Sequence, residues 1–210
     1  MSCYMDYQEG SQMEFTDKNA QENLGWKKNV VLYLHDIVFL LILIMLIFLL
    51  PFRIIVVSGD SMYSTLVDGD YLLLLSNLLY HEPDQGDIVV IGKKAYDDGA
   101  PIVKRVIAKE GQTVDIDFEE GVVYVDGVAL EEDYTYSPTM NHGNVIFPQT
   151  VEKNCIFVLG DNRGVSLDSR YPQIGQIDRR EILGKALFLF LPGTHYGQLS
   201  RDFERIGATQ

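Results

Sequence analysis

The stretch Ile37 to Leu50 reads IVFLLILIMLIFLL and contains fourteen apolar residues without a break. Fourteen residues are short for a membrane span and also suit the apolar core of a signal peptide. Extending the stretch back gives Val30 to Phe52, which is 23 residues or about 35 Å of helix, enough to cross a bilayer. We therefore predict one transmembrane helix near the amino terminus.

Two features of the flanking sequence favour an anchor that stays uncleaved. The best small-residue cleavage site, Val57-Ser58-Gly59, would cut into the motif described below. His35 and Asp36 fit the headgroup region if Ile37 to Ile55 forms the hydrocarbon-spanning part. The stretch is thus an anchor rather than a removable leader.

Basic residues around the anchor predict its orientation. Lys27-Lys28 precedes it and Arg53 alone lies close behind it, so the amino terminus is expected in the cytoplasm. We predict a cytoplasmic tail at residues 1–29, a transmembrane anchor at 30–53 and an extracytoplasmic domain at 54–210. This topology puts Cys3 inside and Cys155 and Asp98 outside, so the two cysteines of the chain cannot pair.

Charge and composition exclude several classes of protein. The chain has 17 Lys and Arg against 30 Asp and Glu, a net charge of −13, which would repel the phosphates of a nucleic acid. A hydrophobic content of 47% excludes global disorder. No His, Cys and Asp cluster has metal-ligand spacing. We expect no nucleic acid, no metal and no cofactor.

The chain beyond the anchor carries the signals of short strands. Runs rich in β-branched, Leu or aromatic residues, bounded by Gly, Asp, Asn or Pro, predict strands at Tyr71 to Ser76, Asp87 to Gly92, Ile102 to Lys109, Thr113 to Phe118, Val122 to Val125, Val145 to Phe147, Ile156 to Leu159 and Ile182 to Leu191. Asp126-Gly127 predicts a two-residue hairpin. We expect a mainly β, barrel-like domain without a long amphipathic helix.

The first candidate for chemistry is Ser58-Gly59-Asp60-Ser61-Met62, directly after the anchor. A serine on a glycine turn can present its hydroxyl and its own N–H to one carbonyl. Taken alone, the segment is more typical of a connecting loop. A nucleophilic hydroxyl also needs a base, and His81, His142 and His195 all lie in loop-like contexts typical of solvated histidines.

Lys104 is the other candidate base. Alternation along its strand puts Lys104 on one face with Ile102, Val106 and Ala108, whereas Arg105 shares the other face with Lys109, a cation that can point to water. Burial disfavours the ammonium and lowers the pKa of a lysine, which makes it a possible general base. The competing interpretation is a lysine that packs its stem and extends its amine into water.

A third cluster, Gly160 to Arg170, follows an apolar strand and contains Asp161, Ser166, Asp168 and Arg170. If residues 166–170 are extended, Ser166, Asp168 and Arg170 face one way, and an Asp168–Arg170 ion pair can hold Ser166 in position. The alternative is a surface turn with an exposed salt bridge of little energetic worth.

Together these segments resemble the ordered boxes of type I signal peptidases. The resemblance rests on Ser58-Gly59-Asp60-Ser61-Met62, Gly86-Asp87-Ile88-Val89-Val90, Lys104-Arg105-Val106-Ile107, and Gly160-Asp161-Asn162-Arg163 with Ser166, Asp168, Ser169 and Arg170. It covers nearly all of the outer domain, and the single anchor resembles that of the short, single-span members. Four boxes in order are specific, whereas any one of them is not.

The resemblance implies a membrane-anchored serine endopeptidase with a Ser/Lys dyad that cleaves signal peptides from exported preproteins after small residues of the Ala-x-Ala type. It implies Ser61 as nucleophile and Lys104 as general base. Ser166 would hydrogen-bond the lysine amine, and Asp161, Asp168 and Arg170 would support the site. The implied partners are preprotein signal peptides and the lipid bilayer, at the cell membrane, with the substrate bound as an added strand.

Three departures from the family pattern bear on local geometry. Ser64 stands where the family usually has Pro, and residues 108–112 replace its usual Gly-x-Pro-Gly-Asp. Some relatives carry a hydroxyl residue two positions before the nucleophile, where this chain has Gly59. The oxyanion hole is therefore expected to use backbone N–H groups of Ser61 and Gly59.

Three other classes of protein share part of this pattern. Repressor-type proteases of the DNA damage response also use a Ser/Lys pair, but this chain has a membrane span and no room for a DNA-binding domain. A membrane-anchored cysteine transpeptidase would use Cys155, His142 and an arginine such as Arg163, although a cysteine at the start of an apolar strand is commonly buried and inert. A non-catalytic surface adaptor would leave Lys104 without a chemical role.

Overall fold

The computed structural model describes residues 26, 28–47, 49–93, 100–194 and 200–209. Cys3, Lys27, Asp98 and His195, which entered the sequence predictions, lie outside the described residues. The chain divides into two compact units, Met1–Leu49 and Leu50–Gln210, and each is described by itself.

A single helix is the described part of the first unit. It covers Lys28–Ile47, is long and apolar enough to cross a membrane, and buries none of its surface within the chain. The predicted anchor extended to residue 53, but β1 (Phe52–Val56) already begins at Phe52 and pairs with β2 (Tyr71–Ser76). Pro51 explains the earlier helix end, because proline in a helix interior removes a hydrogen bond and clashes with the preceding turn.

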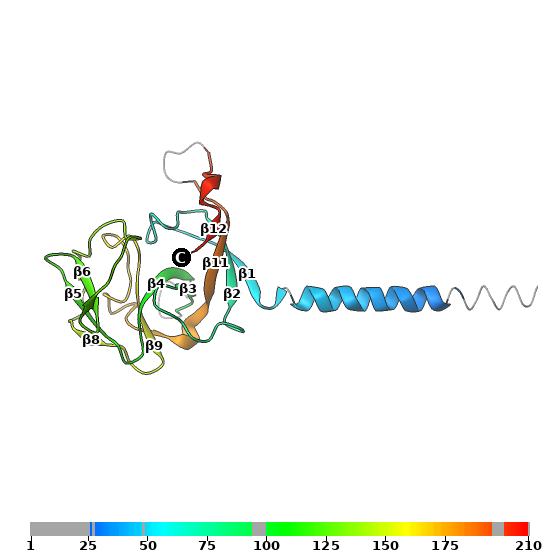
Figure 1. The fold of residues 1–210 in the computed structure, drawn as a ribbon, viewed down its shortest axis with the longest axis horizontal. Coiled ribbons are helices and arrows are strands. Elements are labelled where there is room, and N and C mark those ends of the chain that lie inside the picture. The colour runs from blue at the N-terminus through cyan, green and yellow to red at the C-terminus, as the bar shows by residue number, and fades with distance from the viewer. Residues whose placement is uncertain (1–25, 27, 48, 94–99, 195–199, 210) are drawn as a thin grey trace, which may run out of the picture. The chain divides into compact units, whose positions relative to one another are not determined.

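The described residues of the second unit form two antiparallel sheets (Figure 1). The large sheet has eight strands in the order β1-β2-β11-β3-β4-β9-β10, and β12 pairs with β11. Its other strands are β3 (Ile88–Ile91), β4 (Ile102–Lys109), β9 (Cys155–Leu159), β10 (Ile177–Asp178), β11 (Ile182–Leu191) and β12 (Gly207–Ala208). The small sheet, order β7-β6-β5-β8, consists of β5 (Thr113–Asp117), β6 (Val122–Val125), β7 (Val128–Ala129) and β8 (Gln149–Thr150).

The mainly β fold is as predicted, and the helices described after the first unit are two short 3₁₀ turns, η2 (Arg179–Glu181) and η3 (Phe203–Arg205). The hairpin is also confirmed, since Val125 pairs with Val128 and both turn residues, Asp126 and Gly127, have positive φ. The strand predicted at residues 145–147 is wrong. The chain bends there and enters β8 after Pro148, and the Ile146 side chain is exposed.

Strand β4 lies in the middle of the large sheet, between β3 and β9. Its six central residues are buried, and they contribute to three different apolar clusters: Val103 to one, Val106 to a second, and Ile107 with Ala108 to a third. A register shift between Val106 and Ala108 lets both sides of the strand meet apolar neighbours. Any polar side chain on β4 must therefore find a partner inside the protein.

Candidate active site

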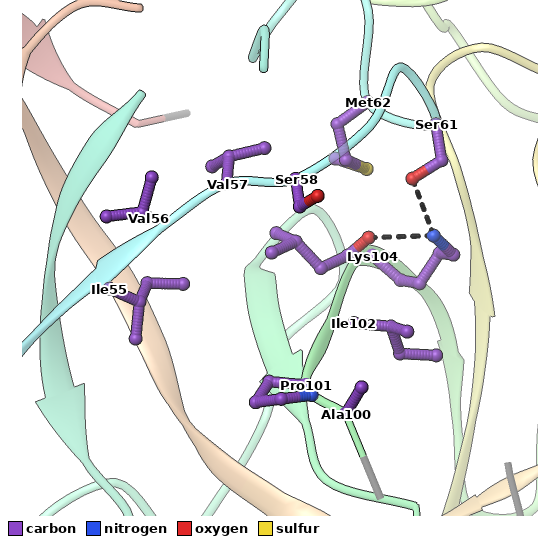
Figure 2. Close-up of a pocket in the computed structure, with 11 residues that line it drawn as sticks. Ile55, Val56, Val57, Ser58, Ser61, Met62, Ala100, Pro101, Ile102 and Lys104 are labelled. Carbon is purple, nitrogen blue, oxygen red and sulfur yellow. Dashed lines mark hydrogen bonds between the residues drawn. The ribbon is translucent and has the colours of Figure 1, made fainter. Parts of the chain in front are cut away.

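Lys104 and Ser61 meet beside the centre of the large sheet. Lys104 is 3% exposed, and its Nζ lies 2.7 Å from Ser61 Oγ and 3.0 Å from the Val103 carbonyl oxygen (Figure 2). Burial lowers the pKa of Lys104 to about 8, against the opposing effect of the Asp168 and Asp161 carboxylates. The amine is thus placed against a hydroxyl and has a reduced affinity for its proton.

The loop that carries Ser61 is closed at its base and anchored by its own apolar side chains. In this Ser61 loop, residues 57–70, the Val57 N–H donates to the Asp70 carbonyl and the Gly69 N–H donates to the Val57 carbonyl. The loop also buries Met62 and Leu66 in the core. Because these anchors lie on both sides of the turn that holds Ser61, the serine stays at the surface of the core facing Lys104.

Of the two backbone N–H groups expected to form the oxyanion hole, those of Gly59 and Ser61, the first already donates a hydrogen bond within the Ser61 loop. The Gly59 N–H donates to Asp68 Oδ1 over 2.9 Å, so it is already engaged. The Ser61 N–H donates to no residue within the described part of the chain. The positive φ of Gly59, 84°, gives the glycine a conformational role in the turn.

Arg105 is buried, which corrects the expectation that its strand face points to water. It is 2% exposed and makes a two-pronged ion pair with Asp161, with Nε at 2.9 Å and Nη2 at 2.7 Å from the carboxylate oxygens. Its guanidinium also stacks 3.9 Å from the centre of the Tyr134 ring. Lys109, on the same predicted face, does reach the surface and pairs with Asp84.

The Gly160–Arg170 segment is folded into turns rather than extended, and most of it is buried, although Gly164 and Val165 are exposed. Asp168 and Arg170 form the predicted ion pair, 2.8 Å from Nε to Oδ1, but both side chains are inaccessible to water. The interpretation as an exposed surface turn is therefore wrong. Asp168 also accepts from the Gly160 N–H at 3.1 Å, which ties the segment to the end of β9.

Ser166 lies in the site without the predicted hydrogen bond to the lysine amine. Its hydroxyl is buried and has no hydrogen-bond partner in the part of the chain that is described, whereas Lys104 bonds Ser61 and Val103. Gly160 brings Ser166 close to the dyad residues, since a Cβ at position 160 would lie 2.2 Å from Ser166 Oγ and 2.5 Å from the Ser61 carbonyl oxygen.

Several residues that hold the site together escaped the sequence analysis. Asn162 donates from its N–H to the Ser61 carbonyl and from its side chain to the Asp60 carbonyl, each at 3.1 Å. The Thr65 hydroxyl donates to Asp161 over 2.6 Å. Glu132 pairs with the buried Arg163. Asn162 stands inside a quoted motif and Thr65 lies close to another, but neither was given a role, because only the fold shows what they contact.

Two adjoining clefts open at the dyad residues, and both are lined by Ser58, Ser61, residues 100–102 and Lys104. The first, about 400 Å³, is otherwise apolar, with Ile55, Val57 and Met62 among its walls (Figure 2). The second, about 610 Å³, continues to Asp60, Asn162, Val165 and Leu167. An extended peptide lying across Ser61 would thus meet one apolar and one more polar side.

The other candidate groups lie in settings poorly suited to chemistry. His81 and His142 are exposed, and His142 stacks on Phe118. Burial raises the pKa of the Cys155 thiol, which works against a nucleophilic thiolate, and Arg163 is engaged by Glu132. The described residues hold no group of three His, Cys, Asp or Glu side chains suited to a metal ion.

Comparison with known proteins places the chain in a family. Residues 30–191 match the family model described as signal peptidase, peptidase S26. The chain is 37% identical over 150 residues to "Probable signal peptidase I-1" of Synechocystis sp., covering 68% of this chain and 73% of that protein. It is 33% identical over 180 residues to "Signal peptidase I S" of Bacillus subtilis, covering 81% and 94%.

Among solved structures, a signal peptidase I from Enterococcus faecalis is similar at 30% identity, with a TM-score of 0.40, covering 50% of this chain and 96% of that one. The family match, residues 30–191, includes most of the apolar helix, the Ser61 loop, strand β4 with Lys104 and the Gly160–Arg170 segment. The chain therefore belongs to the signal peptidase family, peptidase S26, and is a serine peptidase.

Proposed function

We propose that the protein cleaves signal peptides with Ser61 as nucleophile and Lys104 as general base. The observation that carries this proposal is the 2.7 Å contact between the Ser61 hydroxyl and a lysine amine that is 3% exposed. A lysine with a pKa of about 8 supplies far more neutral amine near neutral pH than one at its ordinary value, and only the neutral amine can accept a proton.

In the proposed mechanism, the Ser61 hydroxyl attacks the carbonyl carbon of the scissile bond while its proton passes to Lys104 Nζ. The N–H of Ser61 then faces the negative oxygen that develops. When the peptide bond breaks, the Lys104 ammonium returns the proton to the leaving nitrogen, and the acyl group stays on Ser61. The same amine takes a proton from water as the water attacks the ester, and the ammonium then returns this proton to Ser61 Oγ as the signal peptide is released.

Asp161 and Asp168 support the dyad through the arginines they bind. Arg105 neutralises Asp161 and Arg170 neutralises Asp168 by direct ion pairs. Each carboxylate is thus balanced, and its attraction for the Lys104 ammonium is weakened. This arrangement lets burial dominate the pKa of the lysine, as the base requires.

Preference for small residues of the Ala-x-Ala type is supported by the apolar cleft. Its walls are the side chains Ile55, Val57, Met62 and Ile102, which offer an uncharged surface beside the nucleophile. The cleft also runs along two extended segments, residues 55–58 and 100–104, with which an extended peptide can pair through its backbone. Small side chains at alternate positions suit that geometry.

Membrane anchoring is supported by the Lys28–Ile47 helix and by an apolar outer face on the large sheet. Leu73 on β2 is paired with Ile54 on β1 and with Phe188 on β11, so these three residues are neighbours across the sheet. Exposed Val56 and Phe190 extend this face. Soluble domains seldom expose so many neighbouring apolar side chains, so we place this face against the bilayer, with residues 1–29 cytoplasmic and 54–210 outside.

The dyad is tested by alanine substitutions in the full-length protein and a preprotein cleavage assay. We expect Ser61→Ala and Lys104→Ala each to lower kcat by at least about a thousandfold, because no other described group can replace the nucleophile or base. Cys155→Ala and His142→Ala are the matched controls and should retain wild-type rates. Near-normal cleavage by the Lys104→Ala enzyme would overturn the assignment.

Specificity is tested with the same assay. Replacing the alanine at the first position before the cut by leucine should reduce cleavage strongly, because the proposed preference admits only small side chains there, while the same change at the second position should have little effect. Equal rates for both substrates would contradict the proposed preference.

A further inference from the structure

The carboxyl-terminal segment reaches back to the Ser61 loop through one side chain. Arg205, in η3, donates from Nη1 to Asp70 Oδ1 at 3.1 Å and from Nη2 to Asp70 Oδ2 at 2.7 Å. Nη2 also donates to the Thr65 carbonyl oxygen at 3.1 Å. One guanidinium therefore binds two separate points of the Ser61 loop, with 135 and 140 residues of chain between the partners.

Asp70 is the fixed point of this contact. Its side chain is inaccessible to water and also accepts from the Val67 N–H at 2.8 Å and the Gly193 N–H at 2.6 Å. A buried carboxylate with these four donors is rigid, and removal of Arg205 would leave it with two. Figure 1 shows η3 and β12 beside the end of β11, from which Gly193 continues.

Thr65 links the same contact to the other side of the site. Its carbonyl accepts from Arg205, while its hydroxyl donates to Asp161, the partner of Arg105. Arg105 is the chain neighbour of Lys104 on β4. Thr65 is therefore held between the carboxyl-terminal segment and the strand that supplies the lysine.

The front of the Ser61 loop has a separate support, because Asn162 binds the Asp60 and Ser61 carbonyls. The rear of the loop, residues 65–70, is tied to the carboxyl-terminal segment by Arg205. A hydroxyl must sit within a few tenths of an ångström of its base for proton transfer, and a shift of about 1 Å can cost a hundredfold in rate.

We propose that Arg205 is a positioning residue for the cleavage reaction: by binding Asp70 and Thr65 together it holds the Ser61 loop at hydrogen-bond distance from Lys104. This inference rests on the proposed nucleophile and base. It assigns the carboxyl-terminal segment a part in turnover, although Arg205 itself touches neither the dyad nor the clefts beside it.

The test is steady-state cleavage of a preprotein by the full-length Arg205→Ala protein, with the folded fraction measured by circular dichroism. We expect kcat per folded molecule to fall ten- to about a hundredfold with KM changed by less than about twofold. Guanidinium ion, added at concentrations too low to unfold the protein, should restore part of kcat. Arg201→Ala is the matched control, because Arg201 lies in the same segment and binds the Pro192 carbonyl instead.

A wild-type kcat per folded molecule in Arg205→Ala would overturn the proposal, as would a rise in KM alone. If Arg205→Ala does not fold, Arg205→Lys replaces it. The lysine keeps a charge beside Asp70 but cannot bind both loop points as the planar guanidinium does, so an intermediate kcat is expected and full activity would overturn the proposal. Ser61→Ala is measured alongside: if it retains activity, the proposed function fails, and if it is inactive while Arg205→Ala is normal, only this inference fails.

Discussion

Lys104 shows how the surroundings of a residue change the pKa of its side chain. In water a lysine amine is protonated at neutral pH, but strand β4 is covered on both faces and takes the Lys104 side chain out of solvent. The free-energy cost of burying the ammonium lowers its pKa to about 8. The nearby carboxylates, Asp161 and Asp168, oppose this effect only in part because each is paired with an arginine.

The residue-scale prediction concerns pH. Below a pKa of about 8 the amine is charged and cannot accept the Ser61 proton, so kcat/KM should rise by roughly tenfold per pH unit until the pH passes that value, and then level off. Lys104→Arg should be inactive at every pH, because a guanidinium keeps its proton. Initial rates from pH 5 to 10 measure this; a profile that is flat across pH 7 to 9 would exclude Lys104 as the base.

At the scale of elements, the active site depends on how closely β9 and the segment after it approach the Ser61 loop. Gly160 follows β9 directly and packs against both Ser166 and the Ser61 carbonyl. Its N–H binds Asp168, and its carbonyl accepts from Arg163 at 3.0 Å. A side chain at this position has no room without moving the backbone of one of the two segments.

The element-scale prediction is that Gly160→Ala destabilises the protein by roughly 1 to 3 kcal/mol through overpacking and lowers cleavage activity, because the added methyl group pushes Ser61 from Lys104. Gly164→Ala is the matched control: it lies in the same turn, where the nearest atom to a new Cβ is 3.9 Å away, and its effect should stay within about 0.5 kcal/mol. Urea unfolding and cleavage rates measure both. Equal stabilities for the two variants would refute the packing argument.

At the scale of the whole molecule, the covalent distance between the apolar helix and Ser61 limits where the enzyme can act. The candidate span covers Lys28–Ile47, and β1 begins at Phe52. Even a fully extended chain from residue 47 to residue 61 spans less than about 50 Å. With the helix in a membrane, as proposed, cleavage takes place within that distance of the bilayer that a signal peptide also leaves.

The prediction at this scale concerns topology. In a Cys155→Ala background, a membrane-impermeant thiol reagent applied to intact cells should leave Cys3 unlabelled, because Lys27-Lys28 favours a cytoplasmic amino terminus. A cysteine introduced by Ile146→Cys, at a side chain 87% exposed, should react. Labelling of Cys3 without labelling at position 146 would invert the topology and refute processing of exported proteins by this site.

Local patterns in the sequence were sufficient for the class of fold and for the family. The apolar stretch predicted the helix, alternation and turn residues predicted most strands, and Asp126-Gly127 predicted its hairpin, because these features depend on neighbours along the chain. Ser61 and Lys104 were chosen by motif as the candidate nucleophile and base. Pro51 also carried a local signal, and reading it as a helix terminator would have placed the start of β1 correctly.

Only the tertiary structure decided which charged side chains form ion pairs and which of them are buried. Alternation along β4 led us to expect Arg105 near solvent. This expectation failed because alternation separates core from surface only where a sheet has one exposed face, and both faces of β4 are covered. The pairs of Arg105 with Asp161 and of Arg205 with Asp70 join residues 56 and 135 positions apart. Burial and pairing at such distances result from the packing of the whole sheet, so the local sequence determines the residue types while the fold determines the pKa of Lys104 and the position of Ser61.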